Sequence, residues 1–274
     1  MSDDFNRDVA LGGDGQVGNT ITMNGNLLIQ GENSFGVLIN FFADNNNVTI
    51  NGNTTITGNL TAGLGYWTAG DTLGSGNVMT QNGNITTTGD SSNGLWLFAN
   101  GTGDASVSNT INMNGSITTT GNGGAGIFMH MNTGQTINMV GDISTQGTQG
   151  ASAGGLSFAN GIFMRDDNDN NTINITGDIT TSGAGSSAIN NTNGTNNTFN
   201  ITGDIITSGT GGNSEPVLLE NSDSNTFTLS GAVHSLGGDQ AIAVDATSQN
   251  NTFTFKRGVS FIGELENNGG TTNK

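Results

Sequence analysis

Short runs of alternating apolar and polar residues follow one another along the chain, and most runs end at a glycine. The clearest run reads N-T-I-N-I-T-G-D-I-T-T-S-G, from Asn171 to Gly183, and it returns 26 residues later as N-T-F-N-I-T-G-D-I-I-T-S-G, from Asn197 to Gly209. Alternation with a period of two, rich in Ile, Val and Phe, predicts short, half-buried strands. No window keeps the period of an amphipathic helix, so the chain is expected to be all-β.

Looser copies of the same phrase fill most of the chain. We anchor each copy on its first inward apolar residue, and successive anchors lie 26 to 36 residues apart. The anchors are Ile21, Val48, Met79, Ile111, Ile137, Ile173, Phe199, Phe227 and Phe253. Asparagine stands two places before the anchor in eight of the nine copies, with Gln135 as the exception, and glycine stands ten places after it in all nine. A nearly constant period with occasional excess indicates a repeat protein with loop insertions.

A third apolar run follows the first two in most copies, as in Gly94–Phe98 and Gly161–Met164. Three short strands per copy predict a right-handed parallel β-helix (β-solenoid) of about nine coils of about 26 residues each. One coil cannot bury its apolar residues alone, so stacked neighbours complete the core. Stacking also brings the repeated asparagines together in a ladder, in which side-chain amides hydrogen-bond along the axis.

The repeat divides the chain into three parts. Residues 19–263 are expected to form the β-helix, and residues 1–18 a lead-in that caps its open end. Residues 264–274 are polar and predict a tail, or the boundary of a longer chain. The excess residues of the longest copies, Asn100–Ser108 and Thr148–Asn160, are expected to be inserted at corners.

Charge and composition exclude several function classes. Of 274 residues only five are Lys or Arg, and the net charge is −17, so nucleic acid and anionic membranes are poor partners. The chain has no cysteine, which excludes disulfides, thiolate metal sites and cysteine nucleophiles. No apolar run is long enough to span a membrane. His130 and His234 lie four coils apart and cannot share one site, and no catalytic triad or phosphate-binding loop emerges, so we expect no enzyme.

Three aspartates fall in one column of the repeat, five places after the anchor. Asp142, Asp178 and Asp204 would lie about one strand spacing apart, and carboxylates so close repel one another unless they are solvated or bridged by a cation. Oxygen ligands suit calcium, which makes this column a candidate metal site and calcium the one candidate cofactor. The alternative is that Asp and Asn occupy this column as turn residues beside glycine, as Asn53 does.

The third strands carry a candidate interaction ridge. Leu38, Trp96, Phe128 and Phe163 occupy equivalent places between apolar neighbours. Because strand residues alternate in direction, either this set or the neighbouring set points outward, and an exposed apolar ridge would bind a partner. Two alternatives stay open: a corner insertion covers the ridge, or the assumed register is shifted by one residue.

The phrase G-x-I-x-T-x-G…G-I, combined with N-T-I ladders, resembles the passenger domains of bacterial autotransporters over roughly residues 19–263. The resemblance implies secretion or display on the outer surface of a Gram-negative bacterium. It also implies a protein or glycan ligand on the surface to which the passenger binds.

Several functions remain open from the sequence alone. The first is a non-enzymatic structural or adhesive role outside the cell, and the main alternative is a filament subunit that associates with copies of itself. A carbohydrate-active enzyme would use paired carboxylates such as Asp166 and Asp167. Outward threonine columns, such as Thr22, Thr49 and Thr80, would suit ice binding, although ordinary β-propensity on a solvated face is the explanation that the sequence favours.

Overall fold

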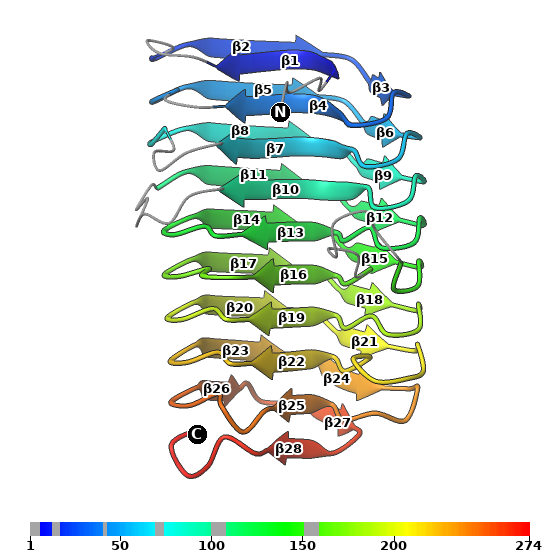
Figure 1. Cartoon of the computed structure of the whole chain (residues 1–274), viewed down its shortest axis with the longest axis vertical. Coiled ribbons are helices and arrows are strands. Elements are labelled where there is room, and N and C mark those ends of the chain that lie inside the picture. Colours follow the sequence, from blue (N-terminus) through cyan, green and yellow to red (C-terminus); the bar gives the residue numbers. More distant parts are fainter. Residues whose placement is uncertain (1–5, 13–16, 41–42, 69–73, 100–107, 151–158) are drawn as a thin grey trace.

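The computed structural model describes residues 6–12, 17–40, 43–68, 74–99, 108–150 and 159–274. Within these residues every regular element is a β-strand, and the strands form three parallel sheets of nine, nine and ten members. Each coil contributes one strand to each sheet, as Figure 1 shows. The predicted parallel β-helix is therefore confirmed.

We call the three sheets I, II and III in the order in which the chain enters them within a coil. Sheet I contains β2 (Thr20–Asn24), β5 (Asn47–Asn51), β8 (Val78–Asn82), β11 (Thr110–Asn114), β14 (Thr136–Val140), β17 (Thr172–Thr176), β20 (Thr198–Thr202), β23 (Thr226–Ser230) and β26 (Thr252–Phe255). Sheet II contains β3 (Leu27–Ile29), β6 (Thr54–Ile56), β9 (Ile85–Thr87), β12 (Ile117–Thr119), β15 (Ile143–Thr145), β18 (Ile179–Thr181), β21 (Ile205–Thr207), β24 (Ala232–Ser235) and β27 (Ser260–Ile262). Sheet III contains β1 (Asn6–Gly12), β4 (Ser34–Asn40), β7 (Ala62–Thr68), β10 (Asn93–Ala99), β13 (Ile127–His130), β16 (Ile162–Arg165), β19 (Ile189–Thr192), β22 (Val217–Glu220), β25 (Ile242–Val244) and β28 (Leu265–Asn267).

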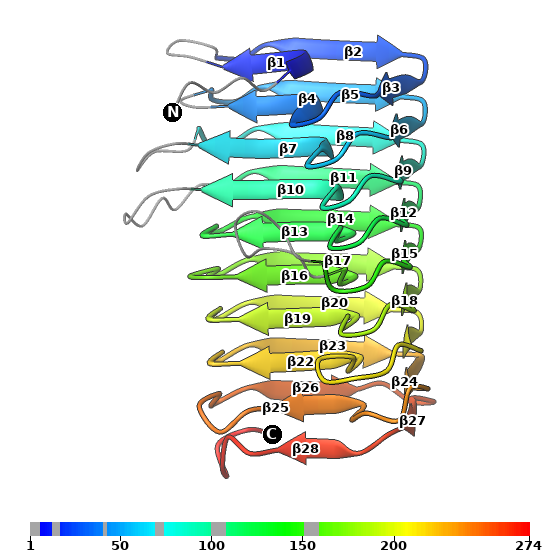
Figure 2. The same ribbon diagram turned by 45° about the vertical axis from the view of Figure 1, so that its right-hand side comes forward.

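The chain winds in one direction throughout. In Figure 1 sheet I runs behind and sheet III returns in front, while successive coils descend, so the winding is right-handed. Figure 2 shows sheet II as the short side that joins the other two. The register follows the repeat: Ile111 of β11 pairs with Ile137 of β14, and Ile137 pairs with Ile173 of β17.

The core is a set of apolar columns that run along the axis. Strands of sheet I alternate between buried and half-exposed residues, as the two-residue period predicts. Near the C-terminal end, Phe199 stacks on Phe227 with ring centroids 4.5 Å apart, and Phe227 stacks on Phe253 at 4.8 Å. These centroid distances match the strand spacing, so each ring continues the column of its neighbour.

The predicted asparagine ladder is present and buried. The backbone N–H of Asn46 and its Nδ2 both donate to Oδ1 of Asn77, each at 3.0 Å. Asn77 repeats the arrangement with Asn109, and Asn225 repeats it with Asn251. These ladder amides bond to the coils beside them, which avoids the cost of an unpaired polar group.

The solenoid extends beyond the limits expected from the repeat. β1 lies within residues 1–18 and pairs with β4, and β28 lies within residues 264–274 and pairs with β25. Lys274 also exchanges backbone hydrogen bonds with Asn251 and Phe253 beside β26. The residues expected to be a lead-in and a tail thus belong to the stacked structure where it is described. The expected corner insertions lie largely outside the described residues.

Candidate functional site

The four ridge residues occupy equivalent positions on sheet III and point away from the main core. Trp96 pairs with Phe128, and Phe128 pairs with Phe163, which confirms the assumed register. Their neighbours Leu95, Leu97, Ile127 and Met129 belong to the main core.

The ridge is not an open apolar strip. Leu38 is 0% exposed, Phe128 3% and Phe163 2%, and only Trp96 is half-buried. The side chains form two small clusters outside the main core, one around Phe35 and Leu38 and one around Phe128 and Phe163. The register assumed from the sequence is therefore correct, and three of the four ridge side chains are buried rather than exposed. The surface that remains consists of parts of Trp96 and Phe98.

Aromatic rings run from this surface towards a polar group. Trp96 stacks on Phe98 with centroids 5.1 Å apart, and Phe98 lies 4.5 Å from the ring of His130. Nδ1 of His130 lies 3.4 Å from Oδ2 of Asp166. The same oxygen forms an ion pair with Nε of Arg165 at 2.9 Å. His130, Arg165 and Asp166 meet because β13 and β16 are adjacent and in register.

The imidazole of His130 is held in its neutral form. Burial lowers the pKa of His130 and outweighs the opposing effect of the Asp166 carboxylate. The 3.4 Å contact is therefore not an ion pair at neutral pH, and Nδ1 makes no hydrogen bond within the described residues. The sequence could have suggested this meeting, because the third strands align His130 with Arg165, the residue before Asp166.

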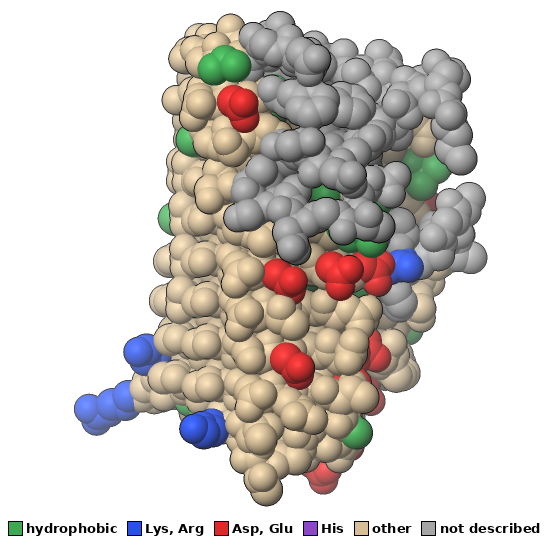
Figure 3. Space-filling model, turned by 60° about the vertical axis from the view of Figure 1, so that its left-hand side comes forward, with side chains coloured by type: hydrophobic (Ala, Val, Ile, Leu, Met, Phe, Trp, Pro, Cys, Tyr) green, Lys and Arg blue, Asp and Glu red, His purple; other side chains and the backbone are tan. Residues whose placement is uncertain are grey.

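Acidic side chains gather on the corner loops that lead from sheet III to sheet I, as Figure 3 shows. Asp166, Asp167 and Asp169 lie in one such loop, between β16 and β17. Asp166 and Asp167 both have positive φ, 53° and 41°, so the backbone turns sharply there. Asp169 accepts bonds from the backbone and hydroxyl of Thr195 one coil further on, which ties this loop to the next.

The three aspartates of the proposed calcium column lie one coil apart at the corner between sheets I and II. Each accepts a backbone hydrogen bond from the next coil: Asp142 from Asp178 at 2.9 Å, and Asp178 from Asp204 at 2.7 Å. Asn53 accepts the equivalent bond from Asn84 at 2.9 Å. The column therefore has a hydrogen-bonding role that asparagine also fills. The described residues contain no group of three or more His, Cys, Asp or Glu side chains placed to hold a metal ion.

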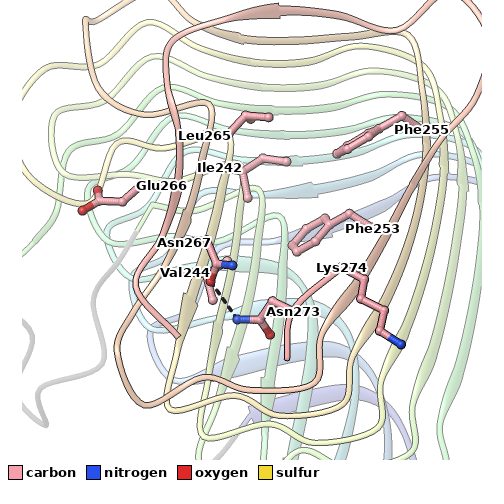
Figure 4. A pocket seen from close by; sticks show the side chains of 9 residues that line it. All are labelled: Ile242, Val244, Phe253, Phe255, Leu265, Glu266, Asn267, Asn273 and Lys274. Carbon is pink, nitrogen blue, oxygen red and sulfur yellow. Dashed lines mark hydrogen bonds between the residues drawn. The ribbon is translucent and has the colours of Figure 1, made fainter. Parts of the chain in front are cut away.

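An apolar cavity of about 160 Å³ opens at the C-terminal end of the rod. Phe253, Phe255 and Leu265 line it, and Asn273 donates a 2.8 Å hydrogen bond to Asn267 at its rim (Figure 4). Phe255 is 39% exposed and Leu265 is 56% exposed. The core is thus partly open to solvent at this end.

Comparison of the chain with protein-family models, with curated protein sequences and with solved structures finds no match in any of the three. Among the described residues, no helix has the length and apolar character needed to cross a membrane.

Proposed function

We propose that this chain is a non-enzymatic structural rod with an adhesive role, displayed outside a Gram-negative cell in the manner of an autotransporter passenger domain. The observation that supports this proposal is the buried asparagine ladder, which joins successive coils from Asn46 to Asn109 and again from Asn171 to Asn251, on either side of Gln135. It fixes the register of a long, regular scaffold without any cysteine. About nine strand spacings give a rod roughly 40 Å long.

Such a scaffold suits display of contact surfaces away from a cell. The inward columns, ladders and glycines are required for stacking, whereas the corner loops and the outward residues of sheet III vary from coil to coil. The ligand in this proposal is a protein or glycan that contacts those variable positions. The partly exposed Trp96 and Phe98 and the acidic loop at Asp166 are the contact positions that differ most from the repeat.

Surface display can be tested with an epitope tag inserted between Gly211 and Gly212, two exposed positions where an added side chain meets nothing within 4 Å. Protease added to intact cells should remove the tag while an internal marker protein survives. A tag that resists protease until the cells are lysed would contradict the proposal. Adhesion is tested separately, by the binding of beads coated with the purified chain to glycan arrays and to cells.

A second function, the filament subunit, is favoured by the partly open core at both ends of this chain. Ile21, Met23 and Leu27 pack against the core while half-exposed at one end, and Phe253, Val259 and Phe261 do so at the other. A second copy stacked end to end would cover both groups. Electron microscopy of purified protein would then show fibres that Phe255→Lys abolishes. Monodisperse rods at high protein concentration would count against this function.

A further inference from the structure

Six threonines form an unbroken column on the outward face of sheet I. Their pairing is in register through six successive strands, from β11 to β26. They are Thr110, Thr136, Thr172, Thr198, Thr226 and Thr252. All six side chains are half-exposed or exposed. Neighbouring members therefore repeat at the strand spacing of roughly 4.8 Å.

The hydroxyls of this column are available to solvent. None of the six threonine side chains hydrogen-bonds to another described residue, whereas several outward threonines at or beside sheet II do. Thr88, Thr120 and Thr180 each donate to a backbone carbonyl of the preceding coil at 3.4 Å. Both sheets look threonine-rich in the sequence, but the six hydroxyls of sheet I have no partner among the residues that the structure describes.

A column of four asparagines runs beside the threonines, two residues further along β11, β14, β17 and β20. Nδ2 of Asn138 donates to Oδ1 of Asn112 at 3.0 Å, and the bonds from Asn174 to Asn138 and from Asn200 to Asn174 are 2.9 Å each. Each amide is thereby fixed in one orientation. Asn138 and Asn174 both donate and accept, so each keeps one N–H and one oxygen lone pair for water, because an amide has two donors and two acceptor sites.

The outward positions of the nine strands of sheet I carry no charged and no aromatic side chain, although the chain has a net charge of −17. Salt bridges, sugar-ring stacking on aromatic faces and the aromatic or Arg anchors of protein interfaces are therefore missing from this face. This face presents the hydroxyl and methyl groups of threonine and the oriented amides of asparagine in a regular grid, and water can contact all of these groups.

The grid spacing points to ordered water. Hydrogen-bonded water oxygens lie about 2.8 Å apart, and tetrahedral geometry then places second neighbours about 4.5 Å apart. The strand spacing exceeds this value by only about 0.3 Å. We propose that the outward face of sheet I, centred on the Thr110–Thr252 column and the Asn112–Asn200 column, binds the surface of ice. This inference goes beyond the adhesive role and does not depend on where the rod is displayed.

The test uses the purified 274-residue chain carrying a fluorescent label, a slowly growing ice hemisphere and a measurement of thermal hysteresis. We expect the wild-type chain to enter the ice and to produce hysteresis. Thr172→Lys, in the centre of the threonine column, should lose both. Thr118→Lys is the matched control, because Thr118 is the half-exposed outward residue of β12 in sheet II and the substitution is identical.

Circular dichroism of each variant establishes that it is folded. If Thr172→Lys does not fold, Thr172→Val replaces it, since valine has nearly the same shape but lacks the hydroxyl; it should reduce ice uptake. Exclusion of the wild-type chain from ice would overturn the proposal. An equal loss of ice uptake in Thr118→Lys and Thr172→Lys would also overturn it. If the wild-type chain is excluded from ice but is removed from solution by insoluble cellulose or chitin, the face binds a crystalline polysaccharide and the proposal is wrong.

Discussion

Asn171 donates two hydrogen bonds to a single atom of Asn197, one coil further along the rod. Its backbone N–H reaches Oδ1 of Asn197 at 2.9 Å, and its Nδ2 reaches the same oxygen at 3.1 Å. Both side chains are at most 1% exposed. Nδ2 of Asn197 in turn donates to the backbone carbonyl of Asn168 at 2.6 Å. The buried amide of Asn197 thus bonds to both Asn171 and Asn168 of the preceding coil, and these bonds fix the register between the two coils.

Replacing Asn197 by alanine should therefore be strongly destabilising. The substitution leaves the buried backbone N–H of Asn171 without a partner, whereas its Nδ2 keeps the carbonyl of Asn132 and the carbonyl of Asn168 keeps the N–H of Thr195. An unsatisfied buried group costs about 1–3 kcal/mol. We expect a loss of about 1–3 kcal/mol in the free energy of unfolding, measured by urea denaturation. Asn200→Ala is the matched control: it breaks a ladder that is only partly buried, and it should cost less than about 1 kcal/mol. Equal losses would show that burial of the ladder is not what stabilises the rod.

The glycine that ends each second strand is required by the close approach of neighbouring coils. A Cβ added to Gly183 would collide with the backbone carbonyl of Gly147 in the preceding coil. Gly183→Ala should therefore lower the midpoint of thermal unfolding sharply, because backbone cannot move aside without breaking the stack. Gly212→Ala serves as the control, since nothing lies within 4 Å of its added Cβ. That variant should leave the midpoint unchanged or slightly raised, because alanine restricts the unfolded chain.

The periodic part of this fold follows from the sequence, because a column is visible wherever every coil repeats it. The inward residues, the buried asparagines and the glycines after the second strands all repeat, and the structure confirms their roles. Elements that depart from the repeat were not predicted. β19 carries the polar residues Asn190 and Asn191 where other coils carry apolar ones, and β1 precedes the first copy.

The candidate site was less accessible to sequence analysis. Alternation shows that either Phe128 and Phe163 or their strand neighbours point outward, but it shows neither which set does so nor that these two side chains are nearly fully buried. The contact between His130 and Asp166 depends on a register across a coil with inserted residues. The hydroxyls of sheets I and II look alike in sequence, and only their hydrogen bonds distinguish them.

Glu215 makes the stability of the rod depend on pH. The side chain is 7% exposed, and burial raises the pKa of its carboxyl above the ordinary value near 4.5. The folded state therefore binds the proton more tightly than the unfolded state, so stability falls as the pH rises from 4.5 through the folded-state pKa. Glu215→Gln should raise the free energy of unfolding at pH 7 and leave it nearly unchanged at pH 4, as measured by urea denaturation at both values.

Asp245 supplies a comparison of opposite sign. Burial raises its pKa, but hydrogen bonds from Ser248, Thr247 and the backbone of Asn221 outweigh that effect, so the net pKa is lowered. Its contribution to stability is present above the ordinary pKa and is lost as the pH falls through the folded-state value. Asp245→Asn should thus destabilise at pH 7, and the difference from wild type should shrink in acid. If both variants shift stability in the same direction at pH 7, these assignments are wrong.

Substitutions in the aspartate column at the corner of sheets I and II can distinguish a hydrogen-bonding role from calcium binding. Oδ1 of Asp178 accepts the backbone N–H of Asp204, and an asparagine oxygen performs the same function at Asn53. Asp178→Asn should therefore keep full stability in a chelator and gain slightly at low salt, because one of three neighbouring negative charges is removed. Asp178→Ala should lose about 1 kcal/mol in the same buffer, since the acceptor itself is gone. Thermal unfolding of the wild-type chain and both variants, with and without millimolar calcium, completes the test. If the column binds calcium, the ion should raise the unfolding midpoint of the wild-type chain but not that of Asp178→Asn. If the column only accepts hydrogen bonds, calcium should leave the midpoints of all three proteins unchanged.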